Sequence, residues 1–150
     1  MLNLLKYVFS SLQRHKVRYI VIGGIAAVLY GVPRATFDLD ILIDAKAENA
    51  KKLLEAFLEA KLGTAALTTV DELISQAITI FKERVRIDVQ TSLPGLNFEE
   101  AWERRETMEY QKQKFYVASR EDLISSKRAA GRPVDLKMCV CSNPKDNLYA

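Results

Sequence analysis

The sequence has few residues that bind metals through sulfur or imidazole, with two cysteines and one histidine in 150 residues. Cys139 and Cys141 are separated by a single residue, which suits neither a local disulfide bridge nor a zinc knuckle. His15 lies far from both cysteines in the sequence, which argues against a four-ligand zinc site. These scarcities exclude a disulfide framework, and a reduced cytoplasmic protein is the simpler interpretation.

Long apolar runs are also lacking, and no segment is long enough to span a membrane. Residues 1–16 have neither the continuous apolar core nor the small-residue cleavage site of a signal peptide. Apolar residues between Leu2 and Leu12 instead recur at helical spacing. This pattern predicts an amphipathic helix packed on the domain, with a membrane-surface helix as the alternative. We expect no membrane partner.

A strong excess of one charge is absent as well. The net charge is +3, and the basic residues are spread through the chain, which permits a nucleic-acid or nucleotide partner without demanding one. No repeat, low-complexity segment or linker divides the sequence. A length of 150 residues with 49% apolar content is typical of one globular domain with its own core. We therefore predict a single domain over residues 1–150.

Periodicity and turn residues predict a mixture of helices and strands. The predicted helices are 2–12, 25–30, 48–60 with Gly63 as its stop, a short helix capped by Thr69 or Asp71, 98–105, 120–130 capped by Ser119, and 134–141. The predicted strands are 17–22, 34–44, a hairpin of 77–81 and 85–90 with its turn at 82–84, and an edge strand within 109–117. This order indicates an α+β fold, a small mixed sheet with helices packed mainly on one side.

Three acids stand out on the predicted strands. Asp38 and Asp40 lie two residues apart in the extended segment 34–44, so both side chains point to one face while apolar residues take the other. Two such carboxylates repel each other unless a cation lies between them. Asp88 lies on the polar face of strand 85–90, and if the two strands are neighbours the three carboxylates converge. Oxygen-rich sites of this kind suit Mg²⁺ or Mn²⁺, and two such ions can hold the attacking and leaving oxygens of a phosphoryl displacement.

Gly23 and Gly24 lie between the first strand and the helix that follows it. Their bare backbone N–H groups at a helix start suit a triphosphate, and the missing side chains let a ligand approach closely. An alternative interpretation joins this pair to Asp44 at a strand end as a dinucleotide-binding motif. That motif lacks its third glycine here, and it leaves Asp38 and Asp40 unexplained.

Taken together, the Gly-Gly pair, the Asp-Leu-Asp that follows thirteen residues later and the distant Ile-Asp-Val resemble the signature of the nucleotidyltransferase superfamily related to DNA polymerase β. The form of segment 34–40 is similar to the minimal prokaryotic members, including AbiEii-like toxins and MNT-type antitoxins. Segment 119–135, with a lysine on a helix and an Arg-x-x-Asp turn, resembles a later motif of that branch. The resemblance covers residues 17–138, nearly the whole chain.

This resemblance implies an enzyme that uses two Mg²⁺ or Mn²⁺ ions to transfer a nucleoside monophosphate from an NTP to a hydroxyl acceptor. Asp38 and Asp40 would ligate both ions. Asp88 would ligate the catalytic ion and help to deprotonate the acceptor. Gly23 and Gly24 would hold the triphosphate.

The resemblance also assigns supporting roles. Lys127 would contact phosphate or support the site electrostatically, and Arg34 and Thr36 would touch phosphate or order the turn. The family pattern often has another acid where this chain has Met138, which leaves open whether Asp135 is functional or only structural. The acceptor could be a protein, a tRNA or a small molecule, and the resemblance admits a partner protein of a toxin–antitoxin pair. The alternative function is an antitoxin or regulatory binding module with weak or absent catalysis.

Overall fold

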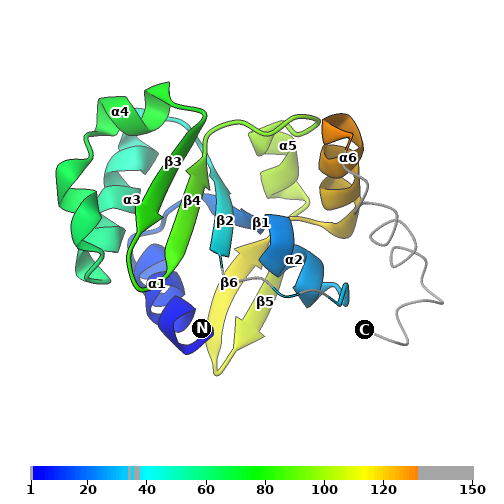
Figure 1. Ribbon diagram of the computed structural model, residues 1–150, viewed down its shortest axis with the longest axis horizontal. Coiled ribbons are helices and arrows are strands. Elements are labelled where there is room, and N and C mark those ends of the chain that lie inside the picture. The colour runs from blue at the N-terminus through cyan, green and yellow to red at the C-terminus, as the bar shows by residue number, and fades with distance from the viewer. Residues whose placement is uncertain (1, 34, 36–37, 132–150) are drawn as a thin grey trace.

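Six strands form one mixed sheet in the order β3-β4-β2-β1-β6-β5 (Figure 1). The structure is a computed structural model that describes residues 2–33, 35 and 38–131. The strands are β1 (Tyr19–Ile22), β2 (Asp38–Ile43), β3 (Ile78–Lys82), β4 (Arg86–Gln90), β5 (Glu106–Tyr110) and β6 (Gln113–Val117). β2 runs parallel to β4 and β1 parallel to β6, whereas the other neighbours are antiparallel. The predicted α+β class with a small mixed sheet is confirmed.

Helices lie on both sides of this sheet. They are α1 (Leu2–Arg14), α2 (Gly23–Leu29), α3 (Ala47–Glu59), α4 (Val70–Ser75), α5 (Phe98–Glu103) and α6 (Arg120–Ala130), with a 3₁₀ helix η1 (Gly63–Leu67). In β6, Phe115 stacks on Phe9 of α1 with ring centroids 4.4 Å apart, and Tyr116 meets Trp102 of α5 edge-on at 5.2 Å. Adjacent strand residues point to opposite faces, so α1 and α5 cover different faces. Helices on both faces bury every residue of β1, so the prediction that they pack mainly on one side was wrong.

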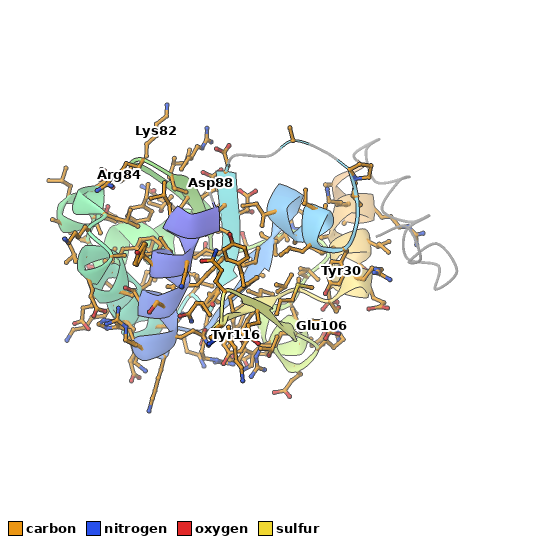
Figure 2. The ribbon with its side chains drawn as sticks, turned by 90° about the horizontal axis from the view of Figure 1, so that it is seen from below. Tyr30, Lys82, Arg84, Asp88, Glu106 and Tyr116 are labelled. Carbon is orange, nitrogen blue, oxygen red and sulfur yellow. The ribbon has the colours of Figure 1, made fainter. Side chains whose placement is uncertain are left out.

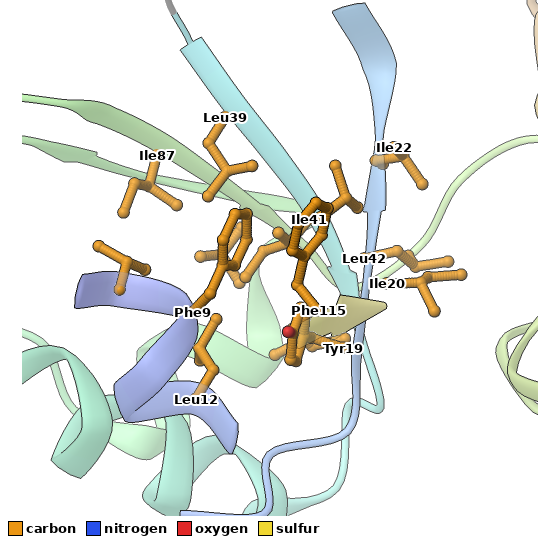
Figure 3. Packing of buried hydrophobic residues seen from close by; sticks show 14 of the residues in the cluster. Phe9, Leu12, Tyr19, Ile20, Ile22, Leu39, Ile41, Leu42, Ile87 and Phe115 are labelled. Atoms are coloured by element: carbon orange, nitrogen blue, oxygen red, sulfur yellow. The ribbon is translucent and has the colours of Figure 1, made fainter. Parts of the chain in front are cut away.

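The hydrophobic core decides which way the acids of β2 point. Leu39 and Ile41 are fully buried on the side of the sheet where Phe9 and Leu12 of α1 pack (Figure 3). Burying one such side chain contributes roughly 2 kcal/mol. Side chains alternate along a strand, so this burial directs Asp38 and Asp40 to the opposite face.

Several predicted boundaries are confirmed by their caps. The hydroxyl of Thr69 accepts a hydrogen bond from the backbone N–H of Glu72, so Thr69 rather than Asp71 caps α4. The hydroxyl of Ser119 accepts one from the N–H of Asp122 at the start of α6. The hairpin of β3 and β4 is present as predicted, with Lys82 opposite Arg86.

Two further predictions were wrong. Segment 109–117 is not one edge strand, because β5 and β6 form a hairpin in which β5 is the edge and β6 pairs with β1. Gln111 and Lys112 turn this hairpin with φ values of 48° and 67°, a conformation usually signalled by Asn-Gly, so the sequence carries no cue for it. Gly63 does not end α3 either. Lys61, with φ 65°, takes the left-handed position after the helix, and Gly63 begins η1.

Some predictions fall outside the described residues: the helix over 134–141, the two cysteines, and the roles of Asp135 and Met138. Among the helices of the described part of the chain, none is long and apolar enough to cross a membrane.

Candidate functional site

The parallel pairing of β2 with β4 brings the three predicted acids to one face. Asp40 lies directly opposite Asp88, and Asp38 lies opposite Arg86. On the other side of β2, the last residue of β1, Ile22, lies opposite Asp40. The chain therefore leaves β1 for α2 right beside the carboxylates.

The surroundings of Asp40 shift its pKa strongly. Partial burial raises its pKa from 3.8 to about 6, and the negative charges of Asp88 and Asp38 act in the same direction, while Arg86 opposes them. Desolvation and like charges both disfavour the ionised carboxylate. The negative charge of the site is therefore not fully balanced by the groups around it. A bound cation would favour the ionised form of Asp40.

Arg86 is a residue of the site that the sequence reasoning missed. Its Nε donates a hydrogen bond to Oδ1 of Asp88 at 2.9 Å, and its Nη2 donates to Oδ2 at 3.3 Å. Its Nε also lies 3.9 Å from Oδ2 of Asp38. The hydrogen bond to Asp88 raises the pKa of Arg86. The alternation in β4 already put Arg86 and Asp88 on one face, and that was the signal available.

The carboxylates fit a divalent ion by their chemistry more than by their present arrangement. Their oxygen atoms are the ligands that Mg²⁺ and Mn²⁺ prefer. Within the part of the chain that the structure describes, however, no three acidic, histidine or cysteine side chains are grouped to hold a metal. Asp88 is engaged by the fork of Arg86 instead. An ion held by Asp38, Asp40 and Asp88 would compete with Arg86 for the oxygens of Asp88.

A cavity of about 650 Å³ lies over the acids. In Figure 2, Asp88 lies near the hairpin turn marked by Lys82 and Arg84. The cavity brings together all the predicted site residues that are described, whereas Arg34 and Thr36 lie outside the described residues. Its lining comprises Ile22, Asp38, Asp40, Ile78, Asp88 and Gln90 from the sheet; Gly23 and Gly24 at the start of α2; Ala77, Ser92, Leu93 and Pro94 from loops; and Leu123, Ser126, Lys127 and Ala130 from α6.

Gly23 is required at its position for two reasons. Its φ of 70° is in the left-handed region, which L side chains rarely adopt. A Cβ at this position would also collide with Oδ2 of Asp40 and lie 3.0 Å from the Cβ and Cγ of Asp40. The sequence predicted a turn glycine here, but only the fold shows that its backbone lies against the central carboxylate.

The dinucleotide alternative gains no support from Asp44. That side chain is buried and accepts a hydrogen bond from Nη1 of Arg18 at 2.7 Å. Arg18 in turn pairs with Glu99 of α5, also at 2.7 Å. Asp44 therefore belongs to an ion-pair network that joins β1 to α5, and it does not line the cavity over the acids.

A separate cavity of about 320 Å³ lies between α1, the end of α3 and the β3–β4 hairpin. Its lining is mostly apolar, and Glu59 on its rim is engaged by both Arg14 and His15 at 2.6 Å. It contains none of the three converging acids. The residues able to support chemistry are in the larger cavity.

Comparison with known proteins shows the family and the fold of this chain. The chain belongs to the family described as "Nucleotidyltransferase of unknown function (DUF6036)", whose model matches residues 2–142. Its fold is similar to a crystal structure from Thermotoga maritima that carries a provisional nucleotidyltransferase assignment, with a TM-score of 0.59 and 18% identity over 93% of this chain and 89% of that one. At this identity the likeness shows the fold alone. No curated protein matches the chain. The nucleotidyltransferase prediction is confirmed, whereas the toxin–antitoxin branch stays a prediction.

Proposed function

From its membership of a nucleotidyltransferase family, we propose that this chain transfers a nucleoside monophosphate from an NTP to a hydroxyl acceptor in the cavity over the acids. The observation that carries the proposal is the placement of Asp40 opposite Asp88 on the cavity floor, beside Gly23 and Gly24. A bond forms between the acceptor oxygen and the α-phosphorus. The bond between that phosphorus and the oxygen that bridges it to the β-phosphate breaks. Pyrophosphate leaves.

Each residue has a role in this proposal. Asp38 and Asp40 would hold divalent ions, Mg²⁺ or Mn²⁺, and Asp88 would help to hold one of them and would take the proton of the acceptor hydroxyl. Bound ions would supply neutralisation of the charge on the transferring phosphoryl group. Gly23 admits phosphate oxygens close to its backbone. Lys127 attracts them from α6, on the cavity wall.

A second candidate function is a binding module with weak or absent catalysis. The observation in its favour is that Arg86 already balances Asp88 and Asp38, so the face is partly neutralised without an ion. In this case a partner chain, as in a toxin–antitoxin pair, would produce the biological effect. Partner capture without pyrophosphate release would favour this function.

The test is release of pyrophosphate from each labelled NTP in the presence of Mg²⁺, with cell extract as the source of acceptors. Asp40→Asn should lower turnover at least about 100-fold, because catalysis of this type depends on positioned charge. Asp71→Asn, an exposed acid on α4, is the matched control and should keep full activity. Undiminished turnover in Asp40→Asn would sink the proposal. The labelled product identifies the acceptor as protein, tRNA or small molecule.

A further inference from the structure

Gln90 ends β4 on the face that carries Asp88, because residues two apart in a strand point the same way. It lies between Ile78 of β3 and Leu42 of β2 in the sheet. Its side chain is half-buried and lines the cavity. It makes no side-chain hydrogen bond to any residue in the described part of the chain. An amide with two donors and one acceptor is thus open to a ligand.

Ser126 faces the same cavity from α6. It is only 6% exposed, yet it lines the cavity. A serine inside a helix often bonds the carbonyl four residues earlier. Among the described residues, the Ser126 hydroxyl has no such partner, and its oxygen remains reachable from the cavity. A hydroxyl that is reachable from the cavity can pair there with water or with a ligand.

The two ends of the cavity differ in access. At one end the loop after β4 packs on α6, since a Cβ at Gly95 would lie 2.9 Å from the Cβ of Ala129 and 3.0 Å from the carbonyl oxygen of Ser125. This contact holds the loop that carries Leu93 and Pro94 against α6. On the β3 side, Ile78 and Ile80 are 49% and 50% exposed, which leaves the cavity open there.

We propose that Gln90 and Ser126 bind the nucleoside part of the NTP and set the base preference. The inference rests on the proposed function. Where this loop packs on α6, Leu93 and Pro94 give the cavity the apolar walls usual in ligand pockets. The acceptor would then enter from the open side over β3. A base that does not match the amide leaves buried polar groups unpaired, which lowers affinity about tenfold.

The experiment is isothermal titration of the full chain with ATP, GTP, CTP, UTP and inorganic tripolyphosphate, each with Mg²⁺. We expect one NTP to bind at least about tenfold more tightly than the other three and than tripolyphosphate. Gln90→Leu and Ser126→Ala should each remove most of that preference while tripolyphosphate affinity stays within about twofold. Ser125→Ala, an exposed neighbour on α6, is the control and should behave as the unmodified chain. Thermal unfolding confirms that each variant folds.

Two results would overturn the inference and leave the proposed function standing: NTPs that bind no more tightly than tripolyphosphate, or a base preference that survives in both Gln90→Leu and Ser126→Ala. A chain that binds neither tripolyphosphate nor any NTP would overturn the proposed function and this inference with it.

Discussion

Replacing Asp40 by asparagine should stabilise the protein while it removes activity. Partial burial, with Asp88 and Asp38 nearby, raises the pKa of Asp40 from 3.8 to about 6. A tenfold change in an acid dissociation constant corresponds to about 1.4 kcal/mol, so this rise corresponds to about 3 kcal/mol against folding with the carboxylate ionised. Asp40 is partly exposed, and solvent screening reduces the effect. We expect Asp40→Asn to gain about 1–2 kcal/mol at neutral pH, or about 3–6 °C in Tm.

The pH dependence follows from the sign of the shift. Below about pH 4 the Asp40 carboxyl is protonated in both the folded and unfolded chains, so the variant has no advantage. Between about pH 4 and 6 the folded chain binds more protons than the unfolded one, so the parent loses stability as the pH rises. Above about pH 6 the whole penalty is present. The advantage of Asp40→Asn should therefore grow from pH 4 to pH 7 and then level off.

The assay is urea unfolding of the parent chain and the variant from pH 4 to pH 8, with EDTA to remove divalent ions. Asp38→Asn is the control, because the Asp38 side chain is 48% exposed, and its change should stay within about 0.5 kcal/mol. An Asp40→Asn variant that is less stable than the parent at pH 7.5, or whose advantage does not change with pH, would refute the electrostatic argument. A more stable but inactive variant would exclude unfolding as the cause of lost turnover.

Three further perturbations test the site and its support. Gly23→Ala should lower the unfolding free energy by at least about 1 kcal/mol more than Gly131→Ala does. Both glycines have positive φ, but only a Cβ at Gly23 would meet neighbouring atoms. Urea titrations of the two variants measure the difference. Arg86→Gln should raise the affinity for Mn²⁺ several-fold in calorimetry, because it releases the carboxylate of Asp88. Weaker Mn²⁺ binding would instead mean that Arg86 orients Asp88 for the ion. Asn49→Ala should cost about 2–4 kcal/mol in urea unfolding, since the buried amide holds three backbone groups. A cost below about 0.5 kcal/mol would show that those groups find other partners.

Local patterns were enough to predict much of this molecule. Alternation along β2 and β4 placed Asp38, Asp40 and Asp88 on polar faces, and the capping hydroxyls of Thr69 and Ser119 marked the starts of two helices. These features depend on neighbours within a few residues, so they can be read in order along the chain. The turn of the β5–β6 hairpin could not be read in this way, because its two residues adopt positive φ without the usual residue types.

The sequence by itself determined that a Gly-Gly turn and three acids exist and which face of each strand they take. Only the tertiary structure decided that β2 and β4 are parallel neighbours in the register that sets Asp40 against Asp88. It also decided that Arg86 engages Asp88 and that Gln90 and Ser126 share a cavity with the acids. The physical reason is that strand order and register follow from burying the apolar faces of distant segments together, and no local pattern encodes that choice.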